Sequence, residues 1–357
     1  MLNPIKNYWN PATRRIPYIR KPLHGAHVYY CDKGKKFDNY ELLVLIASAK
    51  CFRLKNPHST LDFYGDSITV KGLSDINQKI HLYDHMNDTV VFEKTQELAV
   101  SQELFFNFPK FAALEDIACR YKEAVCIIDT DLIPALNLSK TIYSRKMCCT
   151  HHESLEKSDI YPGYEKLHPP QGYSFLQERL SYSGEACNTS ILGIRDYRIA
   201  LEYVREAYRF MSRNRNAGTA DLIYAEQVLF PLIAFDHGIS VYPFIDRCFH
   251  PATGNFALKN VDGSWKKGWA FDNIDVLSDK QYPIYHIWIS KKRLKENDLY
   301  RRFAIMRLAE YIGRYFPECY LTMMNLPEMA EIRELFEENG SAQGAVEKGN
   351  GTDILWT

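Results

Sequence analysis

The sequence carries no net charge and no long hydrophobic run. Lysine plus arginine and aspartate plus glutamate number 44 each, whereas proteins that coat nucleic acid depend on a net basic surface. The longest apolar run of the first half, residues 42–49, is far shorter than the roughly 20 residues that span a bilayer. The basic N-terminal stretch lacks the apolar segment of a secretory signal. We therefore expect no nucleic-acid partner and no transmembrane span, and we expect a cytoplasmic location.

Zinc-type cysteine spacing is also missing. The nine cysteines include no C-x-x-C pair, and several lie in apolar runs, as Cys126 does. This usage predicts reduced, buried thiols in a reducing compartment. The chain is rich instead in hydrophobic residues, 46 % against 25 % charged, which is enough to bury a large core. At roughly 150 residues per domain, 357 residues allow one large domain or two smaller ones.

Strand-like and helix-like segments alternate along the first half. Residues 27–30 form a β-prone run, and Asp38 with Glu41 gives a capping-box pattern ahead of an apolar helix. Residues 61–64 alternate as a strand does, and residues 124–128 form the clearest buried strand. This order predicts an open, largely parallel α/β sheet, in which ligands bind beyond the carboxyl ends of the strands.

The second half is less regular. Proline and glycine punctuate residues 151–182, which predicts a long loop. A strand pattern resumes over residues 187–194, and Asp196 is placed to cap a helix. A second helix is expected over residues 221–235, and further helices over 294–338.

Asp129 and Asp131 follow the buried strand directly. On extended backbone, residues i and i+2 point to one side, so the two carboxylates would face the same ligand. Hard oxygen ligands in this arrangement suit Mg²⁺ or Mn²⁺, usually shared with substrate phosphates. Two charges at the mouth of a buried strand also need a cation or solvent to neutralise them. The alternative, a pair of turn aspartates that cap the next element, stays open.

Two further polar positions lie downstream. Asn188 enters an apolar strand from a segment of small residues, and its amide is able to donate to and accept from a ligand hydroxyl. Glu226 and Gln227 lie on the helix that begins near Asp221, and a carboxylate beside an amide suits a sugar clamp or a catalytic group. The alternatives are a turn residue at Asn188 and a solvated helix face at Glu226 and Gln227.

His286 ends an apolar strand and precedes a basic cluster that includes Lys292. An imidazole is able to serve as a third metal ligand, and lysines neutralise a diphosphate as point charges. Lys110 is a candidate for the same ligand, with a solvated first-turn lysine as the alternative. Tyr29 or Tyr30, at the end of the first strand, is a candidate to stack on a nucleobase. The alternatives are a core aromatic there and a core histidine at 286.

In this order, the four features resemble the motifs of the GT-A class of nucleotide-sugar glycosyltransferases, and most closely its family-eight-like group. Residues 129–131 match the metal-binding Asp-x-Asp (DXD) motif, and residues 187–190 look like the sugar-contacting Phe-Asn-Ser/Ala-Gly segment. Residues 226–227 are similar to a donor-binding Asp-Gln pair. His286 and Lys292 fit the spacing of a late His-x-x-Gly-x-x-Lys motif, which supplies a metal ligand and a phosphate-binding lysine.

The resemblance implies a fold and an activity. The fold is a GT-A, Rossmann-like mixed sheet with helices on both faces and a helical C-terminal extension. The activity is transfer of a hexosyl group from a nucleotide diphosphate sugar, a UDP-sugar first, to a carbohydrate or glycolipid acceptor, as in polysaccharide biosynthesis. Ser190, Glu226 and Ile289 depart from the family pattern, so the class is better supported than the family. Whether the reaction retains or inverts stereochemistry is left undecided.

The resemblance also implies roles for the residues named above. Asp129, Asp131 and His286 would ligate Mn²⁺ or Mg²⁺. Glu226 and Asp221 are the catalytic candidates, because an inverting reaction needs a carboxylate base. The residues expected to bind the donor are Tyr29, Tyr30, Lys110, Asp129, Asn188, Gln227 and Lys292.

The expected order along the chain is an N-terminal arm (1–22), a GT-A domain (23–295), a helical extension (296–339) and a disordered tail (340–357). Residues 291–314 hold eight basic against three acidic residues. This stretch is either a solvated helix face or a platform for peripheral contact with an anionic membrane.

Two other classes stay open. A metal-dependent phosphoesterase would use Asp129, Asp131 and the pair His151 and His152, although two-metal sites normally need more clustered ligands. A non-catalytic carbohydrate-binding protein would keep the fold without metal-dependent nucleotide binding.

Overall fold

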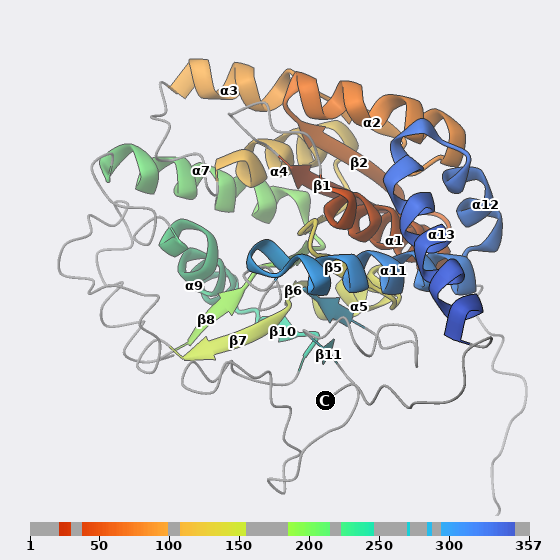
Figure 1. The fold of residues 1–357 in the computed structure, drawn as a ribbon. Coiled ribbons are helices and arrows are strands. Elements are labelled where there is room, and N and C mark those ends of the chain that lie inside the picture. The colour runs from red at the N-terminus through yellow and green to blue at the C-terminus, as the bar shows by residue number, and fades with distance from the viewer. Residues whose placement is uncertain are drawn as a thin grey trace, which may run out of the picture.

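A seven-stranded sheet forms the centre of the molecule (Figure 1). The computed structural model describes residues 21–29, 38–98, 108–154, 185–214, 223–245, 270–271, 284–287 and 294–346. The strands lie in the order β10 (Tyr242–Pro243), β6 (Met147–Cys149), β9 (Ile191–Ile194), β4 (Ala124–Ile128), β1 (Leu23–Tyr29), β2 (Thr60–Gly65) and β3 (His85–Asn87). Each neighbouring pair is parallel except that β9 is antiparallel to both β4 and β6. The predicted mixed, largely parallel sheet is confirmed.

Two smaller sheets lie beside the central one. In the first, β12 (Ile284–His286) pairs with β11 (Ala270–Phe271) and with β5 (Leu132–Pro134). In the second, β7 (His151–Ser154) pairs with β8 (Glu185–Asn188). The first sheet matters for the site, because it joins a late segment of the chain to the residues that directly follow the Asp-x-Asp motif.

Helices cover both faces of the central sheet, as predicted. The helices of the first face are α1 (Asn39–Lys55), α2 (Ser67–Ile80), α5 (Leu138–Arg145), α11 (Asp298–Tyr315), α12 (Pro317–Met324) and α13 (Ala330–Val346), with a short 3-10 turn η6 (Pro327–Met329). The helices of the second face are α3 (Val90–Leu98), α4 (Phe108–Tyr121), α7 (Tyr197–Arg213) and α9 (Leu229–Asp236), with a π-helical turn η4 (Tyr224–Val228).

Strand β4 shows why the sheet needs both layers. All five of its residues are buried. Cys126 and Ile128 face the first core, whereas Val125 and Ile127 face the second, because successive side chains of a strand point to opposite sides. Such a strand reads as a continuous apolar run in the sequence, and it holds the residue after it, Asp129, at a fixed place on the sheet edge.

Local signals set several helix boundaries. The side chain of Asp38 caps α1 and Glu41 returns a hydrogen bond to the Asp38 N–H, which forms the predicted capping box. The same helix ends at Asn56, directly before Pro57. Asp196 caps α7 by accepting a hydrogen bond from the Arg198 N–H. These contacts involve residues at most four positions apart, so they are readable from sequence.

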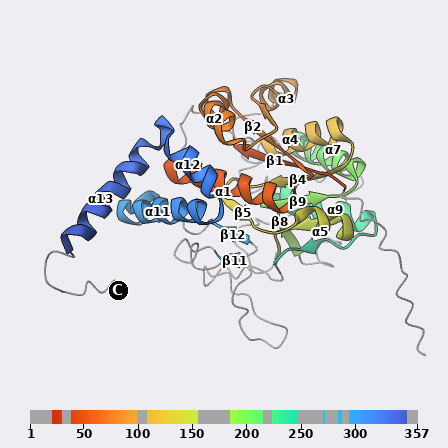
Figure 2. The same cartoon turned by 90° about the vertical axis from the view of Figure 1, so that its right-hand side faces the viewer.

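The C-terminal helices are part of the main core. Tyr311 of α11 packs edge-to-face on Tyr285 of β12, with ring centroids 5.8 Å apart, and its hydroxyl lies 3.3 Å from the sulfur of Cys51 in α1. Figure 2 shows α11, α12 and α13 together at one end of the molecule, next to α1 and α2. Helix α13 continues to Val346, past the point where the disordered tail is predicted to begin.

The arginines of α11 are largely neutralised. Arg301 forms ion pairs with Asp38 and Asp298, Arg302 pairs with Glu338, and Arg307 pairs with Glu310. Of the two interpretations of residues 291–314, this pairing favours a solvated helix face over a platform for an anionic membrane. In the described ranges, no helix is both long and apolar enough to cross a membrane. The cysteines there carry free thiols, and all except Cys119 are buried.

His27 gives the fold a predicted sensitivity to acid. The ring is fully buried in β1, with Nδ1 at 2.8 Å from the Tyr83 hydroxyl and Nε2 at 3.1 Å from the Ser48 hydroxyl. Burial lowers the pKa of His27 to about 3. The unfolded chain takes up a proton at an ordinary pKa of about 6.5, so acid favours unfolding throughout the interval between the two values.

We expect His27 to lower the free energy of unfolding by about 2 kcal/mol between pH 7.5 and pH 5. The measurement is urea unfolding at both values for the wild type and for His27→Gln, in which this part of the pH dependence should disappear. His58→Gln, at an exposed histidine, serves as control. A His27→Gln variant that keeps the full difference between the two pH values would assign the acid sensitivity to other groups.

Candidate active site

The sequence motifs meet at the carboxyl edge of the parallel strands. Tyr29 ends β1, and Asp129 follows β4, its parallel neighbour. Strand β9 runs the other way, so the segment leading into it, residues 188–190, begins at this same edge. The Asp129 N–H donates to the Ser190 carbonyl at 2.8 Å, which ties the two segments together.

Asp131 lies beside His286 although 155 positions separate them in the chain. The Asp131 carbonyl accepts a hydrogen bond from the Ile287 N–H at 2.9 Å, and His286 is in register with Leu132 of β5. This strand pairing places His286 Nε2 at 3.8 Å from Asp131 Oδ1 and at 3.3 Å from the Ser190 hydroxyl. His286 is buried, with 4 % of its surface exposed. The pairing therefore holds two of the three predicted metal ligands together.

Asp129 has a different partner, the ammonium group of Lys110. Lys110, in the first turn of α4, lies 2.7 Å from Asp129 Oδ1 and 2.6 Å from Glu226 Oε1. The Thr189 hydroxyl also donates to Glu226 Oε1, at 2.5 Å. Lys110, Asp129, Thr189 and Glu226 are hereafter called the lysine cluster. Three of them were predicted as site residues, and the Lys110 ammonium joins the other two, Asp129 and Glu226. Lys110 is therefore not the solvated first-turn lysine of the alternative interpretation.

The charge balance of the lysine cluster keeps Lys110 protonated. Burial by itself lowers the pKa of Lys110, but the carboxylates of Asp129 and Glu226 outweigh burial and raise the pKa above its ordinary value. Two carboxylates share one ammonium, so the cluster carries one net negative charge. Glu226 is almost fully buried and is held by two donors on one oxygen, which fixes its orientation.

Glu226 and Gln227 lie in the π-helical turn η4. The Tyr203 hydroxyl donates to the Glu226 carbonyl at 2.6 Å and so satisfies part of the irregular backbone. In the described part of the helix predicted over residues 221–235, this irregular turn precedes α9. Single π turns inside helices occur frequently at functional sites. This turn places the Glu226 side chain in the buried lysine cluster rather than on a solvated helix face.

Tyr29 and Asp131 line a small cavity of about 80 Å³ at the end of β1. The Tyr29 hydroxyl donates to Glu41 Oε2 at 3.1 Å, the same oxygen that accepts from the Asp38 N–H. Tyr40 and Thr130 also line this cavity. The capping residue Glu41 is thus a polar group of the site, a role that its capping-box position hides in the sequence.

Asn188 ends β8, in register with His151 of β7, and its side-chain oxygen accepts from the Ser190 N–H at 3.2 Å. It therefore shapes the turn that leads into β9. The next residue, Thr189, contacts Glu226 in the candidate site, and sequence reasoning missed it. The only signal in the sequence was its position in a segment of small residues. Three predicted site residues lie outside the described ranges, namely Tyr30, Asp221 and Lys292.

The donor set fits a divalent cation that the protein shares with a ligand. One carboxylate and one imidazole, Asp131 and His286, lie at a separation that allows both to reach one ion. Mg²⁺ and Mn²⁺ sites of this kind are completed by water and substrate phosphates. Within the described ranges no group of three or more histidine, cysteine, aspartate or glutamate side chains is arranged to hold a metal. His152 Nε2 donates to the Val241 carbonyl at 3.2 Å, so this ring nitrogen is engaged by the backbone rather than offered to a metal, as the phosphoesterase alternative would require.

No protein-family model matches the chain, and no curated protein sequence matches it. Solved structures do show similarity in fold. The galactosyltransferase LgtC, in complex with donor and acceptor sugar analogues, is 8 % identical, with a TM-score of 0.45 over 87 % of this chain and 99 % of LgtC. Mouse xyloside xylosyltransferase 1 is 9 % identical, with a TM-score of 0.41 over 74 % of this chain and 97 % of that one.

The glycosyltransferase GlyE of Streptococcus pneumoniae TIGR4 is 11 % identical, with a TM-score of 0.40 over 84 % of this chain. The chain spans 64 % of GlyE. All three are glycosyltransferases. At these identities and TM-scores the similarity assigns neither family nor activity, and the function is argued below from the residues themselves.

Proposed function

We propose that this protein is a metal-dependent glycosyltransferase that moves a hexosyl group from a nucleotide diphosphate sugar, with a UDP-sugar as the first candidate, to a carbohydrate or glycolipid acceptor. One observation carries the proposal. The strand pairing that places His286 at 3.8 Å from Asp131 also places both beside the lysine cluster, through the contacts of Ser190. A metal-binding pair and a buried, charged cluster thus meet at the sheet edge where ligands bind in such folds.

Asp131 and His286 are the proposed metal ligands. A divalent ion held there supplies positive charge where the leaving diphosphate develops negative charge. The burial of His286 and the hydrogen bond between its Nε2 and the Ser190 hydroxyl hold the ring, and the backbone pairing to Ile287 holds Asp131. The protein's part is to hold these two side chains in place before the donor arrives, so that little reorganisation is needed during the reaction.

The lysine cluster is proposed to position the donor sugar. Glu226 Oε1 already accepts from Lys110 and Thr189, and the Lys110 ammonium offsets its negative charge. These two donors fix the orientation of the Glu226 carboxylate, which suits a binding partner for a sugar hydroxyl. This favours a binding role for Glu226.

We expect Glu226→Gln to lower kcat by less than tenfold, because the amide oxygen is still able to accept from Lys110 and Thr189. A general base would instead contribute about 10²–10⁴-fold. The measurement is steady-state transfer from the UDP-sugar, with Glu206→Gln, a buried glutamate of α7 outside the site, as the matched control. A hundredfold loss confined to Glu226→Gln would make Glu226 the base of an inverting reaction.

The proposed function is tested by calorimetric titration with UDP, GDP and CMP, each with Mn²⁺ and with a chelator. We expect one nucleotide to bind in the presence of the metal and not in the presence of the chelator. That nucleotide identifies the donor class. Absence of binding in every titration would reject the transferase and leave a carbohydrate-binding protein with this fold.

Contact with an anionic membrane is proposed for a smaller part of the basic stretch. Leu299 and Phe303 of α11 are exposed, at 79 % and 41 %, and lie one turn apart. They would insert as an apolar pair, with the arginines of α11 beside them exchanging their acidic partners for lipid headgroups. Flotation with vesicles that contain or lack anionic lipid should show binding only to the anionic ones, and equal flotation would remove the idea.

A further inference from the structure

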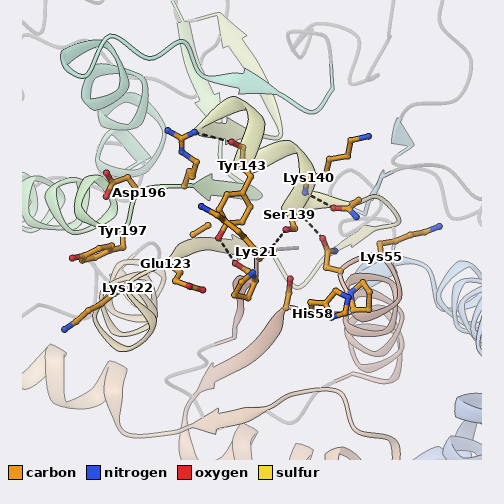
Figure 3. A pocket seen from close by; sticks show the side chains of 17 residues that line it. Lys21, Lys55, His58, Lys122, Glu123, Ser139, Lys140, Tyr143, Asp196 and Tyr197 are labelled. Carbon is orange, nitrogen blue, oxygen red and sulfur yellow. Dashed lines mark hydrogen bonds between the residues drawn. The ribbon is translucent and has the colours of Figure 1, made fainter. Parts of the chain in front are cut away.

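A cavity of about 1540 Å³ lies at the edge of the central sheet opposite the candidate active site (Figure 3). Its walls come from the segments that precede β1, β2 and β4 and from the segment that follows the antiparallel β9. The first turn of α5 and the first residue of α7 complete the lining. The two sites are therefore at opposite ends of the same strands, and one small ligand does not reach both.

Positive charge dominates this cavity. The basic residues that line it are Lys21, Lys55, Lys122, Lys140 and Arg195, and the acidic ones are Glu123 and Asp196. Both acids have other partners. Glu123 pairs with His24 at 3.1 Å, and Asp196 pairs with Arg198 at 2.8 Å.

The three outer lysines, Lys55, Lys122 and Lys140, form no ion pair with any residue that the structure describes. In the view of Figure 3, Lys122 lies on one side of Lys21 and Tyr143, and Lys55 and Lys140 lie on the other. Between them the wall is held together by hydrogen bonds of its own, from the Ser139 hydroxyl to the Lys21 carbonyl at 3.1 Å and from the Ser139 N–H to the Asn56 side-chain oxygen at 2.9 Å. The N-terminal ends of α5 and α7 add positive potential.

Lys122 has a left-handed backbone, as do His81 and Lys146 at the ends of α2 and α5, but of these three residues only Lys122 lines the cavity. Lys122 has a φ of +54°, in the left-handed region, where it ends α4 by donating from its N–H to the Ala118 carbonyl at 3.1 Å. Glycine is the residue that this helix-ending position favours, because a side chain there strains the backbone. The chain nevertheless has a lysine at this position on the cavity wall, and no ion pair with a described residue offsets the backbone strain.

We propose that this cavity binds a soluble anion that carries two or more phosphate groups. A single phosphate would not engage lysines on both sides of the cavity, whereas a polyphosphate chain or a ligand phosphorylated at both ends would. The volume exceeds the roughly 300–1,000 Å³ of ordinary ligand pockets, which leaves room for a sugar or nucleoside between the phosphates. The concave shape favours a soluble ligand over a flat membrane, and the zero net charge of the chain disfavours nucleic acid.

The test is calorimetric titration with inorganic tripolyphosphate in a chelator at low salt, where the proposed metal-dependent donor site is silent. We expect binding by the wild type and by Asp131→Asn. Lys55→Ala/Lys140→Ala should weaken binding at least tenfold, whereas Lys71→Ala/Lys79→Ala, which removes the same charge from exposed lysines of α2, should change it less than twofold.

The Lys122→Gly variant distinguishes the effect of the lost charge on ligand binding from an effect on the stability of the fold. Glycine relieves the backbone at this position, so we expect an equal or higher melting temperature together with severalfold weaker tripolyphosphate binding. The proposal is overturned if the wild type does not bind, or if the α2 double variant loses as much affinity as the cavity double variant. Binding only to phosphatidylglycerol vesicles, lost in the cavity double variant, would also overturn it in favour of a membrane contact. None of these results depends on glycosyl transfer.

Discussion

Asparagine in place of Asp131 is expected to lower sugar transfer about a thousandfold, which corresponds to about 4 kcal/mol of transition-state stabilisation. The substitution preserves shape and removes the charged oxygen that lies 3.8 Å from His286 Nε2. A divalent ion would then keep the His286 imidazole as a ligand and lose the charged carboxylate of Asp131 beside it. The backbone contact from the Ile287 N–H goes to the Asp131 carbonyl and is unaffected.

Two readouts distinguish loss of the metal from loss of the fold. Calorimetry should show that UDP no longer binds in the presence of Mn²⁺, while the melting temperature without metal changes little. Asp75→Asn, at an exposed aspartate of α2, is the matched control and should retain full transfer. If Asp131→Asn binds UDP and Mn²⁺ as the wild type does, the metal is held elsewhere or is not required.

Methionine in place of Lys110 is expected to reduce the free energy of unfolding by about 3 kcal/mol, because it leaves the buried Glu226 carboxylate and the partly buried Asp129 carboxylate without a cation between them. Asp129 and Glu226 both lose their ionic partner, and their repulsion is weakly screened at 21 % and 5 % side-chain exposure. Protonation of either carboxylate relieves the repulsion, so the deficit should shrink between pH 7 and pH 5. Transfer should also fall, since the lysine cluster no longer holds its geometry.

Lys94 offers a close control for this experiment. Its side chain is also 21 % exposed and also bridges two carboxylates, those of Glu97 and Glu115. Those carboxylates are more exposed, at 63 % and 30 %, so Lys94→Met should cost no more than about 1 kcal/mol. Urea unfolding of both variants at pH 7 and pH 5 gives the comparison. If Lys110→Met and Lys94→Met lose the same free energy of unfolding, burial of the lysine cluster does not increase the cost of removing its cation.

The elements of the fold that were predicted well depend on neighbouring residues. Strand β4 coincides with the apolar run 124–128 because a strand buried on both faces needs apolar residues at every position. The start of α1 follows from the capping box of Asp38 and Glu41, a contact between residues three positions apart. The short edge strand β3, whose residues 85–87 pair with β2, was not predicted. An edge strand of this length has too weak a pattern to fix its register.

The candidate site was predicted as a set of residues but not as a set of contacts. The expectation that Asp129 and Asp131 serve one metal stays a prediction, whereas the structure gives them different partners, Lys110 and His286. Glu226 lay 116 positions from Lys110, and no periodicity in the sequence links the two. The roles of Thr189 and Glu41 were missed because short polar side chains next to strands and caps have ordinary structural uses.

The sequence by itself determined the alternating elements, the buried strand that leads to Asp129, and the list of polar residues at strand ends. These features arise from hydrophobic burial and local hydrogen bonding within a few residues. Only the tertiary structure decided that His286 lies beside Asp131, that Lys110 joins Asp129 to Glu226, and that lysines without an ion pair among the described residues line a cavity at the far edge of the sheet. Those arrangements follow from strand pairing and helix packing between segments that are distant in sequence. The free energy that stabilises them comes from contacts throughout the core and not from any single motif.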